Sequence, residues 1–327
     1  MVLFHPPLRE SLIDIRDQLQ TSLGAAYTVE RELGGAGMSR VFLAVDRTLG
    51  RNVVVKVLAP ELAAGVSAER FRREIRVAAS LQHPHIIPLL SAGELPAVGD
   101  DPALPFYTMP MVAGESLRDR LSGGELNVPD AVRILRDIAD ALAFAHEHGV
   151  VHRDVKPENV LVTGDHALVI DFGVAKAVQD AAIGARTLTT VGVALGTPTY
   201  MAPEQAAADP STDHRADIYA FGIVAYELLT GRAPFYGRSA QQVLAAHAIE
   251  QPTPIEQVRP TVPRALAALV TQCIEKRAAD RPQSARELVR ILETVATPVG
   301  TLPTASPIGR RWPSLRAAAM AGAAALV

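Results

Sequence analysis

The sequence has very little cysteine and little excess charge of either sign. Its single cysteine, Cys273, cannot form an internal disulfide, which favours a reducing compartment such as the cytosol. With 32 basic and 35 acidic residues the formal charge is −3, and no long basic block occurs, so nucleic acid is not an expected partner. The first ten residues also lack the basic and then apolar pattern of a signal peptide.

The sequence also lacks the cysteine and histidine spacings of a metal site. His83 and His85 flank a proline in a stretch that is typical of a turn, so a structural role is favoured over a metal pair. The 327 residues, 48% of them apolar, are enough for one large two-lobed domain or for two ordinary ones.

The first part of the chain is dominated by β-type runs. Residues 8–23 carry leucine and isoleucine at helical spacing and predict an amphipathic helix. A second helix is predicted over residues 68–81. The runs that predict strands are 27–33, 41–46, 52–58, 86–90 and 106–112. These runs indicate a five-stranded sheet with one long helix.

The remainder of the chain is mainly helical in pattern. The apolar spacing predicts helices over 130–148, 217–229, 239–249, 263–276 and 284–296. Gly231 follows the second of these and is a typical helix stop. A short β-type stretch, 160–162 and 167–170, is bent by a turn between its halves.

The most specific signal is the segment His152-Arg153-Asp154-Val155-Lys156-Pro157-Glu158-Asn159. Asp171-Phe172-Gly173 begins twelve residues after it. Together the two motifs resemble the eukaryotic-type, or Hanks-type, protein kinase family, and most of all its bacterial receptor-like serine/threonine members.

The resemblance covers about residues 27–295 and implies an α+β, bilobal protein kinase fold. The expected small lobe is 27–111, a β-rich lobe with one helix, and the expected large lobe is 112–295, mostly helical. Residues 1–26 would be a helical N-terminal extension. Residues 296–316, rich in proline, would be a juxtamembrane linker, followed by an apolar tail at 317–327.

The motif residues suit transfer of a phosphoryl group from ATP to a protein hydroxyl. This reaction needs positioning and charge neutralisation more than covalent chemistry. Asp154 is expected to orient the hydroxyl and accept its proton. Asn159 and Asp171 supply oxygen ligands, which suit Mg²⁺ and also allow Mn²⁺.

By resemblance, Lys156 contacts the γ-phosphate and marks the serine/threonine branch of the family. The segment 196–204, reading Gly-Thr-Pro-Thr-Tyr-Met-Ala-Pro-Glu, supports the same branch, and by resemblance it builds a platform for protein substrates. Thr197 in this segment would hydrogen-bond toward Asp154 and Lys156.

Upstream, Lys56 stands at the end of Val53-Val54-Val55-Lys56, which matches the family's third-strand lysine motif. The resemblance implies that Lys56 binds the α- and β-phosphates and pairs with an acid on the next helix. Glu74 lies where the family places that acid, and Glu69 is the alternative. Val54 stands where alanine is usual, against the adenine.

The glycine-rich loop departs from the family pattern G-x-G-x-x-G-x-V. Ala36 replaces the second glycine and Ser39 replaces the third, although a serine there is common in bacterial members. Gly37 still lets backbone N–H groups approach a phosphate. The loop residues expected to contact ATP are Leu33, Gly34, Gly35, Ala36, Gly37, Met38, Ser39 and Val41.

The adenine is expected at the connection between the two lobes. Met109 falls at the gatekeeper position, at the end of the fifth strand. The Pro110 carbonyl and the Val112 N–H would then read the base, and proline is tolerated at 110 because only its carbonyl is used.

Other residues are expected to support the site. Asp217 should accept backbone N–H groups of the catalytic loop, residues 152–159. Glu204 should form a buried ion pair with Arg281.

Arg153 is a cation beside the catalytic Asp154. A phosphate on the activation loop, residues 174–203, would neutralise the charge of Arg153. The expected phosphosites, modified in trans by a second copy of the chain, are Thr187, Thr189 and Thr190.

The C-terminal tail has the order of a membrane boundary. Arg310, Arg311, Trp312 and Arg316 precede an apolar run, Ala317 to Val327, of about 16 Å as a helix, too short to span a bilayer. The order resembles the cytosolic edge of a transmembrane helix, which would place the kinase domain in the cytoplasm. The alternative is a frayed alanine-rich tail.

Two other functions remain open at this stage. A pseudokinase scaffold is favoured only by Ala36, because Lys56, Asp154 and Asp171 are all present. A small-molecule phosphotransferase is disfavoured by the segment 196–204.

Overall fold

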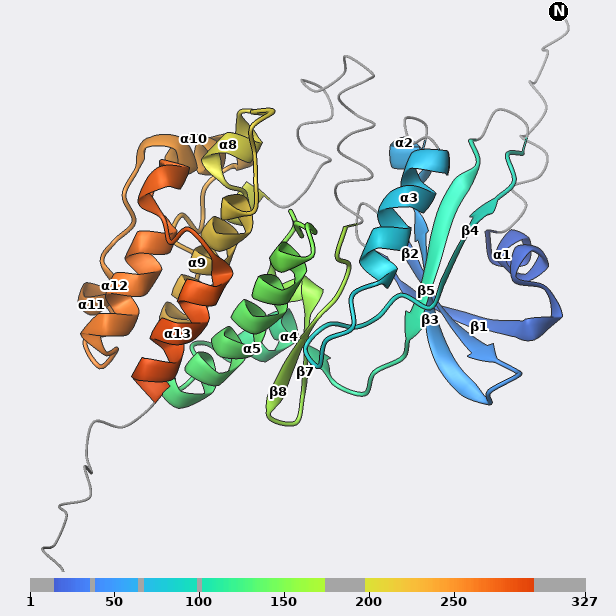
Figure 1. Cartoon of the computed structure of the whole chain (residues 1–327), viewed down its shortest axis with the longest axis horizontal. Helices are drawn as coiled ribbons and strands as arrows, with labels where there is room; N and C mark the ends of the chain where they lie inside the picture. The colour runs from blue at the N-terminus through green and yellow to red at the C-terminus, as the bar shows by residue number, and fades with distance from the viewer. Residues whose placement is uncertain (1–14, 36–38, 64–67, 99–101, 174–197, 297–327) are drawn as a thin grey trace, which may run out of the picture. The chain divides into compact units, whose positions relative to one another are not determined.

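The structure is a computed structural model that describes residues 15–35, 39–63, 68–98, 102–173 and 198–296 (Figure 1). The predicted linker and tail after Ala296 lie outside these residues, as do residues 8–14 of the predicted N-terminal helix. The structure describes the helix α1 (Ile15–Leu23). Among the described residues, no helix combines the length and the apolar character needed to cross a membrane.

The first lobe is a five-stranded antiparallel sheet of order β1-β2-β3-β5-β4. A short helix, α2 (Pro60–Ala63), and a longer one, α3 (Ala68–Ala79), follow β3 in the chain. The strands are β1 (Tyr27–Gly34), β2 (Ser39–Asp46), β3 (Arg51–Leu58), β4 (Ser91–Leu95) and β5 (Leu104–Pro110).

Alternation along β3 gives the sheet two different faces. Val53, Val55 and Val57 are buried in an apolar cluster that also holds Phe106 and Leu19 of α1. Since successive side chains of a strand point to opposite faces, Val54 and Lys56 lie on the other face. The apolar cluster thus fixes which face of the sheet presents the lysine.

The fourth strand differs from its predicted position. Residues 86–90 form no strand, and β4 begins only at Ser91. Pro88 has no N–H for a strand ladder, so the pairing starts beyond it. Ile86 and Ile87 are buried all the same, because this segment binds the other lobe. The Ile87 N–H donates to the Val169 carbonyl at 3.0 Å, and the Val169 N–H donates to the His85 carbonyl at 2.9 Å.

The second lobe is mainly helical. Long helices α5 (Val128–Glu147) and α9 (Arg215–Thr230) pack against each other, with α13 (Ala285–Ala296) on α5 and α12 (Arg264–Cys273) on α9. The shorter helices are α4 (Leu117–Leu121), α8 (Pro203–Ala206), α10 (Ala240–Ile249) and α11 (Ile255–Val258). Figure 1 shows α11 and α12 beside α9, whereas α4 lies beside β7 (Val160–Thr163).

The ends of the long helices follow local sequence rules. The Asn127 side chain caps α5 by accepting the Asp130 N–H at 2.9 Å. Gly231 ends α9 with a φ of 81°, a left-handed conformation that glycine adopts without strain. The predicted stop at this glycine is therefore confirmed, and the helix begins two residues before its predicted start.

A small three-stranded sheet lies beside α5. It consists of β6 (Glu115–Ser116), β7 (Val160–Thr163) and β8 (His166–Val169), in that order. The hairpin of β7 and β8 matches the bent β-type stretch that the sequence predicts. It carries Asn159 just before β7 and Asp171 just after β8, so both residues come to the same end of the hairpin.

Candidate active site

The carboxylate of Asp171 is held by two side chains of the first sheet. Lys56 Nζ forms an ion pair with Oδ2, and the Tyr107 hydroxyl donates to Oδ1 at 2.6 Å. Burial alone would raise the pKa of Asp171, but the Lys56 ammonium and the Tyr107 hydroxyl hold it below its ordinary value. Asp171 is therefore ionised and accepts on both oxygens.

The partner of Lys56 differs from the expectation. In this structure the lysine pairs with Asp171, not with Glu74. A buried carboxylate is costly without a cation, and Asp171 is only 9% exposed, so it takes the nearest ammonium. Glu74 is half-buried on α3, and its backbone carbonyl lies beside Gly173. Its pairing with Lys56 stays a prediction.

The catalytic loop brings Asp154, Lys156 and Asn159 together. Lys156 Nζ lies 2.7 Å from Asp154 Oδ2, and Asn159 Nδ2 donates to the Asp154 carbonyl and to Oδ2 at 2.8 and 3.0 Å. The Asp154 side chain is 23% exposed. It is therefore fixed by its neighbours while one part of the carboxylate stays accessible to a hydroxyl.

The oxygen donors present fit a divalent cation. Because Asn159 Nδ2 donates to Asp154, the amide oxygen of the same side chain points away from that aspartate. The Ile170 N–H donates to the Asn159 carbonyl at 3.0 Å, which places Asn159 next to the residue before Asp171. An amide oxygen and a carboxylate are the hard ligands that Mg²⁺ takes in proteins.

Asp217 supports this loop from α9, as the sequence predicts. Its carboxylate accepts the N–H groups of His152 and Arg153 at 2.8 and 2.7 Å, and His146 Nε2 lies 2.8 Å from Oδ2. Burial alone would raise the pKa of Asp217, but these donors hold it below its ordinary value. Arg153 has a φ of 67°, so the loop is held in a conformation that L-residues rarely adopt.

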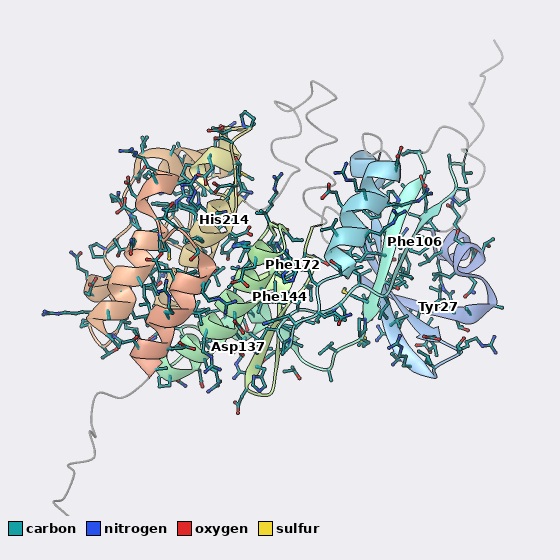
Figure 2. The ribbon with its side chains drawn as sticks, viewed as in Figure 1. Tyr27, Phe106, Asp137, Phe144, Phe172 and His214 are labelled. Carbon is teal, nitrogen blue, oxygen red and sulfur yellow. The ribbon has the colours of Figure 1, made fainter. Side chains whose placement is uncertain are left out.

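His152 links the catalytic loop to the Asp-Phe-Gly turn. It is fully buried, its Nε2 lies 2.8 Å from the Ile170 carbonyl, and its ring packs edge-on against Phe172, which Figure 2 labels, with centroids 4.7 Å apart. The two motifs that the sequence analysis singled out are thus joined by direct contacts.

The expected adenine contacts share one apolar cluster. Met109 is the cross-strand partner of Val54, and both pack with Ile170, Val112 and Leu161. Leu161 was missed at the sequence level. The available sequence signal for Leu161 was the alternation of side chains along the strand after Asn159. Val160 and Val162 are buried in the helical lobe, so Leu161 lies on the opposite face of the strand.

The described part of the glycine-rich loop is tightly built. Gly34 has a φ of 136°, and a Cβ on Gly35 would stand 2.5 Å from the Ser39 carbonyl oxygen. Both positions therefore require glycine. Val41 on β2 is the cross-strand partner of Lys56. Ala36, Gly37 and Met38 lie outside the described residues.

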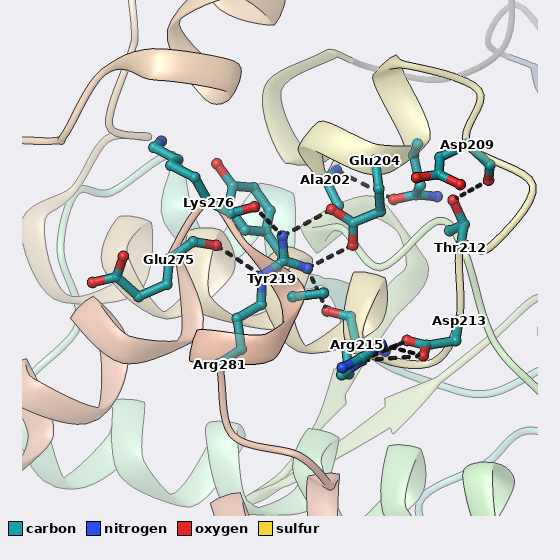
Figure 3. Close-up of polar contacts among 12 residues, drawn as sticks. Ala202, Glu204, Asp209, Thr212, Asp213, Arg215, Tyr219, Glu275, Lys276 and Arg281 are labelled. Carbon is teal, nitrogen blue, oxygen red and sulfur yellow. Dashed lines mark hydrogen bonds and ion pairs between the residues drawn. The ribbon is translucent and has the colours of Figure 1, made fainter.

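The predicted ion pair of Glu204 and Arg281 is present and bidentate. The two guanidinium nitrogens lie 2.6 and 2.8 Å from the two carboxylate oxygens (Figure 3). Arg281 also donates to the carbonyls of Arg215, Glu275 and Lys276, and its side chain is fully buried. It therefore anchors α8, which begins within the predicted substrate platform, residues 196–204.

A second network under this platform was not predicted. Arg118 of α4 donates to Glu227 at 2.7 Å and to Glu158 at 2.8 Å, and it also contacts the Tyr200 hydroxyl, which bonds Glu227. Glu227 is buried inside α9. No local pattern could reveal this network, because its members come from four distant segments. Thr197 and the proposed phosphosites Thr187, Thr189 and Thr190 lie outside the described residues.

The two histidines 83 and 85 lie away from this site. His85 Nδ1 is 3.6 Å from Asp137 Oδ2, and His166 Nδ1 is 3.5 Å from the same oxygen (Figure 2 labels Asp137). His85 Nδ1 is 2.9 Å from the Ala167 carbonyl, and the Ala167 N–H donates to Asp137. These contacts attach the β7–β8 hairpin to α5. His85, Asp137 and His166 also lie close enough together to hold a metal ion, so the structure is compatible with both a structural and a metal-binding role of His85.

Comparison with known proteins places the chain among relatives of one kind. The protein kinase domain family matches residues 27–291. Serine/threonine-protein kinase pkn2 of Myxococcus xanthus is 40% identical over 83% of this chain and 32% of its own length. Serine/threonine-protein kinase PknB of Mycobacterium tuberculosis is 39% identical over 81% of this chain and 42% of its own length.

A solved structure agrees with these sequences. The crystal structure of the PknI kinase domain of Mycobacterium tuberculosis is 30% identical, with a TM-score of 0.64, and covers 83% of this chain and 96% of that one. The chain spans about a third to two fifths of the length of the curated relatives that it matches. It belongs to the protein kinase family, in the bacterial, Hanks-type serine/threonine branch.

Proposed function

We propose that this chain transfers the γ-phosphoryl group of ATP to serine and threonine hydroxyls of proteins. The observation that supports this most directly is the convergence of Asp154, Lys156, Asn159 and Asp171, with Lys56 on the Asp171 carboxylate. Each of these side chains is of a chemical type that can perform its expected role.

Each residue has a role that its surroundings support. Asp154 orients the substrate hydroxyl and takes its proton, while Lys156 beside it neutralises charge on the transferred group. Asn159 and Asp171 hold Mg²⁺ or Mn²⁺, which when bound neutralises the charge of the phosphates. Lys56 contributes a cation from β3, and the apolar cluster around Met109 accepts the adenine.

The test is an assay with radiolabelled ATP, a generic protein substrate and, in parallel, small alcohols. We expect label on serine and threonine of the protein. Label only on the small alcohols would favour a small-molecule phosphotransferase. ATP binding without any transfer would favour a pseudokinase.

We also propose that the chain activates itself by phosphorylation in trans at Thr187, Thr189 or Thr190. The supporting feature is Arg153, a cation next to Asp154 in the catalytic loop. Mass spectrometry of active protein, compared with an Asp171→Asn form, tests this. Phosphate in neither preparation would contradict it.

The order of residues 310–327 supports a further proposal, that the kinase domain lies in the cytoplasm and is tethered by a membrane helix beginning near Ala317. Membrane fractionation of cells that make the natural full-length protein tests this. Recovery of the protein in the supernatant would contradict it.

A further inference from the structure

One cross-strand pair of the first sheet contacts both oxygens of Asp171. In the antiparallel register of β3 and β5, Lys56 stands directly opposite Tyr107. Side chains at such a pair lie about 5 Å apart at their Cβ atoms and leave the same face of the sheet. Lys56 reaches Oδ2 and Tyr107 reaches Oδ1 of the same carboxylate.

Tyr107 places a polar hydroxyl inside a buried, mostly apolar strand. It is 1% exposed, and the strand around it is apolar apart from Thr108, whose hydroxyl lies 2.7 Å from that of Ser91. A buried hydroxyl is costly unless it is hydrogen-bonded. The partner of the Tyr107 hydroxyl is Asp171, a residue of the other lobe. A phenylalanine would fill the same space without this cost, so the hydroxyl serves the contact.

The two contacts differ in kind. Lys56 brings a charge that can be exchanged for another cation, whereas Tyr107 brings a neutral donor that occupies one oxygen. With Oδ1 fixed, rotation of the carboxylate is restricted and Oδ2 keeps its direction. The cross-strand pair of β3 and β5 therefore has two separate roles: Tyr107 holds the Asp171 carboxylate in position, and Lys56 neutralises its charge.

We propose that Tyr107 is a positioning residue of the phosphotransfer site, whose hydroxyl holds Oδ1 of Asp171 so that Oδ2 is presented to a cation. The inference rests on the proposed function for the identity of that cation, a divalent metal bound with the nucleotide. Tyr107 itself touches neither the metal nor the substrate in this scheme.

The test uses Tyr107→Phe, which removes one oxygen and keeps the ring. Mn²⁺ binding to the full chain is measured by electron paramagnetic resonance in the presence of ADP, so that no turnover is needed. We expect Mn²⁺ to bind about tenfold more weakly, since hydrogen bonds to charged groups are of this strength. In assays, half-saturation by Mg²⁺ should rise by a similar factor, with a smaller change in the rate at saturating metal.

The matched control is Tyr226→Phe, which removes the hydroxyl of another buried tyrosine, one that donates to the Thr253 carbonyl at 3.0 Å in the helical lobe. It should leave Mn²⁺ binding unchanged. If the two variants weaken Mn²⁺ binding equally, or if Tyr107→Phe binds Mn²⁺ like the wild type, the inference is overturned. Should Tyr107→Phe not fold, 3-fluorotyrosine at position 107 alters the donor strength alone and should still shift the Mn²⁺ affinity.

The two proposals fail separately. Weaker Mn²⁺ binding by Tyr107→Phe in a chain without phosphotransfer activity would refute the proposed function and support the positioning role. An active wild type whose metal dependence Tyr107→Phe leaves unchanged would support the function and refute the positioning role.

Discussion

At the scale of residues, the two aspartates of the site have different surroundings. Asp171 is enclosed by Lys56 and Tyr107, and both of its oxygens accept. Asp154 is partly exposed and is fixed from one side by Lys156 and Asn159. An enclosed carboxylate suits a cation held in place, and a partly exposed one suits a substrate that comes and goes.

Removing either carboxylate charge should abolish phosphotransfer while the fold persists. Asp154→Asn and Asp171→Asn keep the side-chain volume but remove the proton acceptor and the cation ligand. We expect losses of at least ~10³-fold in rate, the size of such positioning and charge effects. Steady-state kinetics and circular dichroism measure the two quantities. Near-native turnover by Asp154→Asn would show that another group is the base.

His247 of α10 should make stability fall in mild acid. Burial, together with the charge of Lys276, lowers the pKa of His247 from 6.5 to about 4. As the pH falls below 6.5, His247 binds a proton in the unfolded chain, whereas in the folded chain it stays neutral until about pH 4. The stability present above pH 6.5 is therefore lost across this window, about 2 kcal/mol of it by pH 5.

Denaturant titrations at pH 7.5 and pH 5 of the wild type and of His247→Gln measure this loss. The variant should lose about 2 kcal/mol less than the wild type between the two pH values. His148→Gln, at an exposed histidine, is the control and should behave as the wild type. Equal losses in all three proteins would rule out His247 as the source.

The residues that the sequence reveals are those of contiguous motifs. Asp154, Asn159 and Asp171 stand in two short segments, and the folded chain brings these segments together. Tyr107 could not be found in this way, because its role depends on the β3–β5 register and on a contact with the other lobe. A tyrosine inside an apolar strand was the available signal.

At the scale of elements, periodicity predicts the long helices and the regular strands well. It failed at residues 86–90, where an apolar run predicted a strand and the structure has none. Only Ile86 and Ile87 of this run are buried, beside β8, and an apolar run alone does not distinguish this case from a strand. The short helices α4, α8 and α11 were also missed, because four or five residues show no helical period.

Breaking the ion pair between α8 and the segment before α13 should cost much stability. Arg281→Ala leaves Glu204 with its partner removed inside the helical lobe, which typically costs about 3–5 kcal/mol. Urea unfolding monitored by fluorescence measures the loss. The control is Arg277→Ala, whose ion pair with Asp280 is exposed and should contribute less than about 1 kcal/mol. Equal effects would mean that Glu204 and Arg281 are not coupled.

At the scale of the whole molecule, the described core ends with α13. Leu288 and Leu292 of this helix are fully buried, and α13 packs along α5. The expectation of a separate linker and tail after residue 295 came from composition, and it stays a prediction. The two-lobed architecture itself followed from the motif resemblance, since composition allowed either one large domain or two.

A chain shortened to residues 1–296 should keep its unfolding temperature within about 2 °C and its phosphotransfer activity. Removal of α13 as well, in a chain of residues 1–284, should expose the apolar face of α5 and prevent folding. Differential scanning calorimetry and the protein-substrate assay test both chains. A large drop in the unfolding temperature of the 1–296 chain would show that the tail contributes to the fold.

Among the described residues, the backbones of the two lobes are joined at two places, and the side chains of Lys56 and Tyr107 add contacts with Asp171. One backbone attachment is the covalent connection after β5, and the other is the pair of backbone hydrogen bonds that joins His85 and Ile87 to Val169. A body attached at two points keeps one easy rotation, about the line through them. We therefore expect the small lobe to rotate about a single axis relative to the large lobe, so that nucleotide enters and leaves while both backbone attachments stay intact.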